Sequence, residues 1–65
     1  MVLMVNGERQ EVAATTVKAL LGELEYEGDF LVVAVNHDVV KRAHWDEIEL
    51  HDGDRVEILT PRQGG

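Results

Sequence analysis

The dipeptide Asn6-Gly7 lies between two strand-like runs and constrains the start of the fold more than any other feature of the sequence. Met1–Val5 is continuously apolar, and Glu8–Ala13 carries Val12 as its main apolar residue. Asn-Gly is a preferred two-residue turn of a β-hairpin because both turn positions require positive φ angles, which Asn and Gly tolerate. The sequence therefore predicts that the chain opens with an antiparallel hairpin.

A helical pattern follows this hairpin. Its apolar residues recur at the i, i+3, i+4 and i+7 spacing of one helix face. They are Val17, Leu20, Leu21 and Leu24. Thr15 and Thr16 offer hydroxyl groups that can cap the first turn, and Gly28-Asp29 is expected to end the helix. A helix of about two to three turns does not persist alone in water, so this one must pack against a sheet.

The middle of the chain has strand character. Phe30–Val35 is apolar and β-branched, which is typical of a strand buried on both faces. A turn at 36–38 and a short strand at 39–41 are expected next. The link at 42–47 is predicted to be irregular, and its Trp45 is expected to pack in the core or at the sheet edge.

The last strand is predicted at Arg55–Thr60. It follows an alternating segment at 48–50 and a turn at 52–54, and Pro61 ends it because proline has no N–H to donate to a ladder. Strand alternation separates residues that face the helix from residues on the other face. The residues expected to face the helix are Leu3, Val5, Val56 and Ile58.

The order hairpin, helix, strand, short strand, strand predicts an α+β fold. One helix packed across one face of a small mixed sheet is the economical arrangement. With the terminal strand inserted at the centre of the sheet, this is the β-grasp or ubiquitin-like fold. We expect a domain over residues 1–60 and a flexible diglycine tail over residues 61–65.

Composition excludes several function classes. The chain of 65 residues has no cysteine, so it has no disulfide framework, thiolate metal site or thiol nucleophile. Thirteen acidic and six basic side chains give a formal charge of −7, which argues against a nucleic-acid partner. The charge is interpreted mainly as keeping a small protein in solution, and it would also steer the chain towards a basic partner. No apolar run approaches the ~20 residues of a membrane span. We therefore expect a cytoplasmic protein with no membrane partner.

No metal site or bound cofactor is expected. His37, His44 and His51 match no helical or finger-type ligand spacing and are interpreted as surface residues. Asp52-Gly53-Asp54 lacks the further oxygen ligands of a calcium loop and is interpreted as a turn. Lys41 and Arg42 are interpreted as solvated side chains, with the alternative that they flank a docking surface.

The sequence ends at Gly64-Gly65. Two residues without side chains make a thin, flexible thread that can enter a narrow slot in another protein. The α-carboxylate of Gly65 would then be the reactive group, and Gly64 and Gly65 are the leading candidate site.

The sheet face opposite the helix is a second candidate site. Strand alternation leaves Met4 and Leu59 on this face, and they are expected to be adjacent because their strands are neighbours in the predicted sheet. An apolar patch with an acidic rim at Glu57 suits transient protein docking. Arg62, in the tail, is a further candidate partner contact.

The chain resembles the ThiS family of sulfur carriers of thiamine thiazole biosynthesis over essentially its whole length. The resemblance is carried by Val5-Asn6-Gly7, Thr16-Val17-x-x-Leu20-Leu21, Ala34-Val35-Asn36, Val40-x-Arg42-x-x-Trp45, and Leu50-x-Asp52-Gly53-Asp54-x-Val56-Glu57-Ile58 leading to Gly64-Gly65. The residues before the diglycine, Thr60–Gln63, are more polar than in many tails of the family.

This resemblance implies a carrier and not an enzyme. An E1-like adenylyltransferase of the ThiF type would adenylate Gly65 and consume ATP. A sulfur donor such as a cysteine desulfurase would then load the sulfur as a thiocarboxylate, and a thiazole synthase of the ThiG type would receive it. The free carrier is expected to be a monomer.

Three alternatives remain open. The chain could be a sibling carrier for molybdopterin (MoaD-like) or for tRNA thiolation, since the terminal chemistry is common to all. It could be a ubiquitin-like protein modifier joined through Gly65 to lysines. It could also be a β-grasp binding module without terminal chemistry, in which case Gly64 and Gly65 are dispensable.

Overall fold

The computed structural model describes residues 1–28 and 30–60. Within these ranges the chain forms five strands, one α-helix and one 3₁₀ helix. In chain order they are β1 (Val2–Val5), β2 (Glu8–Glu11), α1 (Val17–Glu23), β3 (Val32–Val35), β4 (Asp38–Val40), the 3₁₀ helix η1 (Arg42–His44) and β5 (Arg55–Leu59). The predicted order of strands and helix is confirmed, with each strand slightly shorter than or shifted from its predicted range. The link at 42–47 is not wholly irregular as predicted, because η1 lies at its start.

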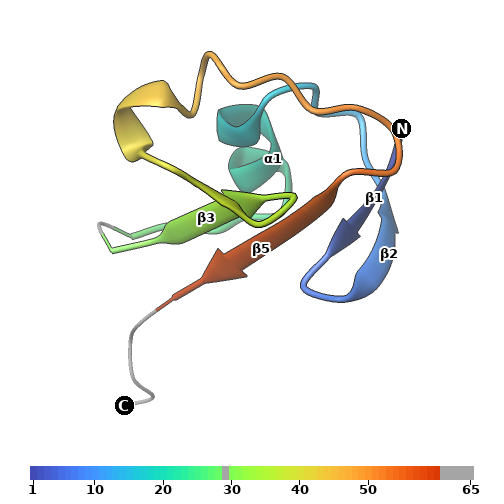
Figure 1. Ribbon diagram of the computed structural model, residues 1–65, viewed down its shortest axis with the longest axis horizontal. Helices are drawn as coiled ribbons and strands as arrows, with labels where there is room; N and C mark the ends of the chain where they lie inside the picture. The colour runs from blue at the N-terminus through green and yellow to red at the C-terminus, as the bar shows by residue number, and fades with distance from the viewer. Residues whose placement is uncertain (29, 61–65) are drawn as a thin grey trace.

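The strands form one mixed sheet in the order β2-β1-β5-β3-β4. β5 is central, where it pairs parallel with β1 and antiparallel with β3. α1 lies against one face of this sheet (Figure 1). The arrangement is the predicted α+β β-grasp fold, in which the last strand of the sequence is held between the first strand and β3.

Both hairpins close with the same type of turn. Asn6 and Gly7 have φ angles of 52° and 83°, and Asn36 and His37 have φ angles of 50° and 75°. Two consecutive residues at positive φ between paired strands make a type I′ turn, whose twist matches that of the strands. The prediction from Asn6-Gly7 is therefore confirmed, and the turn predicted at 36–38 has Asn36 and His37 at its centre.

Helix α1 begins as predicted but ends earlier. The Thr16 hydroxyl accepts a hydrogen bond from the Ala19 N–H at 3.1 Å, which caps the first turn. At the other end the Glu25 N–H bonds the Gly22 carbonyl and the Tyr26 N–H bonds the Leu21 carbonyl. Glu25 has a φ of 63°, so this is a Schellman cap with a glutamate in the left-handed position. The predicted break at Gly28-Asp29 is wrong, because backbone bonds have already closed the helix; Asp29 lies outside the described residues.

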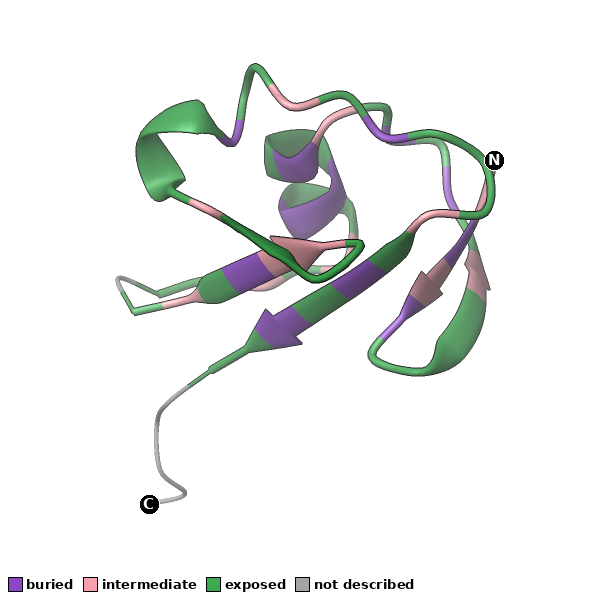
Figure 2. Ribbon diagram, in the orientation of Figure 1, coloured by how far each residue is buried: buried purple, intermediate pink, exposed green. Residues whose placement is uncertain are grey.

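The core lies between α1 and the covered face of the sheet (Figure 2). Twelve of the described residues are buried and apolar. They are Leu3, Val5, Val12, Ala14, Val17, Leu20, Leu21, Val33, Trp45, Leu50, Val56 and Ile58. All four residues predicted to face the helix are among them, and Trp45 lies in the core as expected. A single bridge between Thr16 and Glu49 joins segment 48–50 to the start of the helix.

The prediction that Phe30–Val35 is buried on both faces is wrong. Val33 is fully buried, but Val32 is 41% exposed and Phe30 is 76% exposed. The helix covers one face of the sheet only, so alternate side chains of β3 are directed to the open face. A continuous apolar run therefore produced an exposed apolar surface instead of a doubly covered strand.

Candidate functional site

Strand β5 is the element that leads to the end of the sequence. Its burial alternates: Val56 and Ile58 are buried against α1, whereas Arg55, Glu57 and Leu59 are exposed (Figure 2). The alternation follows from the period-2 geometry of a strand with one covered face. Glu57 and Leu59 therefore lie on the open face, as predicted.

Gly64, Gly65 and Arg62 lie outside the described residues, as does the whole tail predicted at 61–65. The geometry of the site is therefore that of β5 and its neighbours, up to Thr60.

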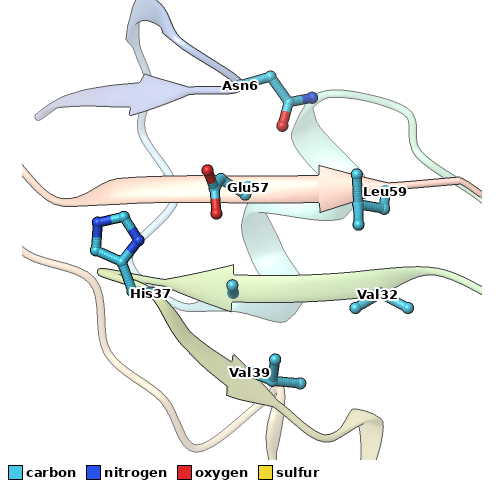
Figure 3. A pocket seen from close by; sticks show the side chains of 7 residues that line it. Asn6, Val32, His37, Val39, Glu57 and Leu59 are labelled. Carbon is cyan, nitrogen blue, oxygen red and sulfur yellow. The ribbon is translucent and has the colours of Figure 1, made fainter.

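A shallow hollow, the open-face hollow, lies on the open face where β5, β3 and β4 adjoin. It is lined by Asn6, Val32, Ala34, His37, Val39, Glu57 and Leu59. Figure 3 shows Leu59 and Val32 towards one end of it, Glu57 and His37 towards the other, and Val39 on the β4 side. The strand register explains this grouping, since Val32 pairs with Leu59 and Ala34 pairs with both Glu57 and Val39.

The open-face hollow is apolar at one end and ionisable at the other. Leu59 is 62% exposed and Val39 is 69% exposed. Ala34 is small, and it lies between Val39 and Glu57 in the register, so the surface is indented at that point. Exposed aliphatic side chains next to a carboxylate make a surface suited to a partner with apolar and basic groups.

The predicted adjacency of Met4 and Leu59 is wrong. β1 and β5 are neighbours, but Met4 pairs with Arg55 and the pairing ends at Val5 and Val56. Leu59 lies four positions beyond Arg55 in the sequence, which is about 13 Å along a strand. Met4 is half-buried and lines a separate small hollow that also includes Arg55 and Glu57. The apolar neighbours of Leu59 come from β3 and β4.

Sequence reasoning identified Leu59 and Glu57 but missed the rest of the open-face hollow. The sequence predicts Val32 to be buried in a strand covered on both faces, gives no face to Val39 in the short strand, and indicates His37 only as a surface residue in a turn. The sequence predicts one helix, and one helix can cover only one face of the sheet. That signal alone indicates that one face of β3 is exposed.

Two asparagines hold the backbone of β5 from opposite flanks. The Asn6 side-chain oxygen accepts from the Ile58 N–H at 2.8 Å, on the β1 side. The Asn36 side-chain oxygen accepts from the Arg55 N–H at 3.0 Å, on the β3 side. Each asparagine occupies the first position of a type I′ turn, so its carboxamide extends a ladder just beyond the end of a hairpin strand.

The remaining candidate residues have structural contacts. Asp52 accepts from the Val2 N–H and Asp54 accepts from the His51 N–H, so the 52–54 segment is a turn, as interpreted. The Trp45 indole N–H donates to the Val40 carbonyl at 3.0 Å, and the Arg42 guanidinium lies 4.6 Å from the centre of the Trp45 ring. Arg42 is therefore not simply solvated.

Neither a metal cluster nor a membrane helix emerges from the described ranges. Within residues 1–28 and 30–60, no three His, Asp or Glu side chains come together in a way that could hold a metal ion. No helix in the same ranges has the length and apolar character needed to cross a membrane.

The sheet order, the single covering helix and the central last strand define a small ubiquitin-like β-grasp protein. The model of the ThiS family matches residues 3–65. This chain belongs to the ThiS family.

Solved structures share this fold over the whole chain. The crystal structure of the thiamine biosynthesis protein ThiS from Geobacter metallireducens matches with a TM-score of 0.84 at 33% identity, covering 100% of both chains. The solution structure of a thiamine biosynthesis protein from the same organism matches with a TM-score of 0.83 at 33% identity, covering 100% of this chain and 88% of that one.

A curated relative has a longer chain. The protein named thiazole synthase from Paramagnetospirillum magneticum is 36% identical over 66 residues, a match that covers 100% of this chain and 20% of the relative. The chain thus spans about a fifth of the length of that relative.

Proposed function

We propose that this protein is a sulfur carrier for the thiazole moiety of thiamine, with the α-carboxylate of Gly65 as its reactive group. The observation that carries the proposal is the family match, which runs from Leu3 to Gly65 and includes the diglycine. The likeness to ThiS structures over the full chain supports the same conclusion. The carrier is a cosubstrate, and its partner enzymes supply the catalytic groups.

The chemistry begins with a carboxylate, which is a poor acylating agent. A carboxylate oxygen of Gly65 attacks the α-phosphorus of ATP, and pyrophosphate leaves to give an acyl-adenylate. A persulfide sulfur then attacks the acyl carbon and AMP leaves, which joins the sulfur to Gly65 as an acyl disulfide. A thiol cleaves the S–S bond, giving the thiocarboxylate and a new disulfide. The carrier has no cysteine, so no thiol of its own can divert the adenylate.

The proposed partners are an E1-like adenylyltransferase, a sulfur donor such as a cysteine desulfurase, and a thiazole synthase. The carrier binds no cofactor, and ATP is consumed by the activating enzyme. The relative named thiazole synthase supports the last partner, because a stretch similar to this chain occupies part of that longer protein. A carrier domain and a synthase in one chain would keep the sulfur donor next to its acceptor.

The open-face hollow is the proposed docking surface for these enzymes. Leu59 and Val39 offer exposed apolar area, and Glu57 offers a carboxylate. The surface includes Glu57 and Leu59 of β5, the last strand of the sequence (Figure 3), so an enzyme docked on this face would bind next to the residues that lead to Gly65. A formal charge of −7 would also steer the carrier towards basic surfaces.

Intact-mass measurement tests the proposal. The untagged protein is incubated with a ThiF-type adenylyltransferase, ATP, a cysteine desulfurase and cysteine. We expect a mass gain equal to the replacement of one oxygen by one sulfur, absent from a variant that lacks Gly65. Adducts to lysines of other proteins would point instead to a protein modifier. Neither an adenylate nor a thiocarboxylate, with a competent enzyme present, would overturn the carrier function.

A further inference from the structure

The flank of β5 that faces β1 is paired with β1 along only part of its length. Pairing between β1 and β5 ends at Val5 and Val56, where the chain turns into Asn6 and Gly7. The other flank of β5 stays paired with β3 as far as Leu59. Beyond Val56, β1 therefore offers no further strand residue to the second flank of β5.

The Asn6 carboxamide takes the place of the missing strand. The Asn6 backbone N–H donates to the Val56 carbonyl at 2.9 Å, and its side-chain oxygen accepts from the Ile58 N–H at 2.8 Å. The side-chain nitrogen lies 3.3 Å from the Tyr26 hydroxyl oxygen, to which it donates. One residue thus joins the first hairpin, the segment after α1 and the distal half of β5.

This contact decides where β5 stops being held on both flanks. With Asn6 in place, the last β5 residue that is hydrogen-bonded on the β1 flank is Ile58, which lies opposite Val33 in the register with β3. Without the carboxamide, that position moves back to Val56. Gly65 lies seven residues beyond Ile58 and nine beyond Val56 in the sequence.

We propose that Asn6 is a positioning residue for the reaction at Gly65. It acts through the Ile58 N–H and fixes the direction of the chain at the end of β5. The inference rests on the carrier function proposed above. When an enzyme is docked on the open-face hollow, the direction of β5 determines how Gly65 approaches the reaction centre of that enzyme. This direction affects the rate because near-attack geometry is sensitive to small displacements. Asn6 makes no contact with the reacting atoms in this scheme.

Asn36 provides a matched control. It occupies the same position of the same type of turn and accepts from a β5 amide in the same way, but at Arg55, the opposite end of the strand. Glycine tolerates the positive φ of both positions, so Asn6→Gly and Asn36→Gly each remove a carboxamide without straining the turn. Asn6→Asp keeps the acceptor oxygen for Ile58 and tests rescue.

Amide hydrogen exchange of the free protein gives the first readout. We expect Asn6→Gly to lower the protection of the Ile58 amide about fivefold, the loss expected for one net hydrogen bond. Asn36→Gly should instead lower the protection of the Arg55 amide. Unchanged protection of Ile58 in Asn6→Gly would overturn the proposal, whatever the reaction does.

Steady-state adenylation by a ThiF-type enzyme, with the carrier as varied substrate, gives the second readout. We expect Asn6→Gly to lower kcat about three- to tenfold because alignment is lost. Asn6 also lines the open-face hollow, so the fall in kcat, and not a change in KM, is the readout of positioning. Asn6→Asp should restore kcat, and Asn36→Gly should match the wild type once thermal unfolding shows that both variants are folded.

Other outcomes would count against Asn6 as a positioning residue. Equal kcat values for Asn6→Gly and Asn36→Gly would mean that only general stability is at work. A raised KM with unchanged kcat would mean that Asn6 contacts the enzyme directly. A wild-type chain that is not adenylated at all would overturn the carrier function and this inference together, an outcome distinct from a loaded wild type with an indifferent Asn6→Gly.

Discussion

Truncation of Leu59 should weaken docking far more than it weakens the fold. Burying a whole leucine side chain contributes about 1.5–3 kcal/mol. Leu59 is 62% exposed in the free protein, so the part still available for burial is worth about 1–2 kcal/mol at the same rate. We expect Leu59→Ala to raise the Kd for the ThiF-type enzyme about 5–30-fold. Because only the smaller part of the side chain is already buried, the free energy of unfolding should fall by about 1 kcal/mol or less.

Isothermal titration calorimetry measures the Kd, and urea denaturation measures the stability of the same variant. Phe30→Ala is the matched control, since Phe30 is also apolar and 76% exposed but does not line the open-face hollow. A Kd for Leu59→Ala within twofold of the wild type, in a folded protein, would refute the assignment of this face. A similar loss in Phe30→Ala would show that general apolar surface, and not the hollow, determines binding.

Three further substitutions test the structural account. Glu25→Gly should stabilise the protein by about 1 kcal/mol, because the left-handed backbone conformation at φ 63° is less favourable for glutamate than for glycine. Thermal unfolding should show a Tm higher by roughly 4–8 °C. An unchanged or lower Tm would contradict the assignment of Glu25 to the left-handed position of the helix cap. Glu23→Ala should lower the free energy of unfolding by about 1–2 kcal/mol, since its carboxylate accepts from the Ala13 and Ala14 N–H groups; urea denaturation measures the loss, and Glu23→Gln, which keeps one acceptor oxygen, should lose less. Val33→Ala should cost about 2–3 kcal/mol in the same assay, because Val33 is fully buried, and a loss no larger than that of an exposed-site variant such as Phe30→Ala would contradict its place in the core.

Local signals predicted the elements of the fold because each has a mechanism within a few residues. Asn6-Gly7 closes a hairpin, and the Thr16 hydroxyl caps the helix. The end of the helix was not predictable in the same way. Glu25 occupies a left-handed position that usually favours glycine, so the backbone bonds that end α1 leave no residue-type signal.

The candidate site was predictable only in part, because it depends on contacts between distant segments. Alternation along one strand placed Leu59 and Glu57 on the open face. The register between β1 and β5 set Met4 apart from Leu59, and a period-2 pattern does not specify such a register for parallel strands. The β3–β4 hairpin then brought Val32 and Val39 to Leu59, a grouping that follows from sheet order and not from any local motif.

Folding, docking and positioning of the chain end are expected to depend on three different sets of atoms in β5. Val56 and Ile58 are directed into the core, Glu57 and Leu59 are directed to the open face, and the Ile58 N–H lies in the plane of the sheet against Asn6. The two sets of side chains point to opposite faces and the N–H is nearly perpendicular to both, so a change to one set leaves the others largely in place. Core substitutions should therefore change the folded fraction, open-face substitutions should change Kd, and loss of the Asn6 carboxamide should change kcat. A carrier that must stay folded, dock and present its end through the same five-residue strand needs this separation, because otherwise partner binding would compete with its own stability.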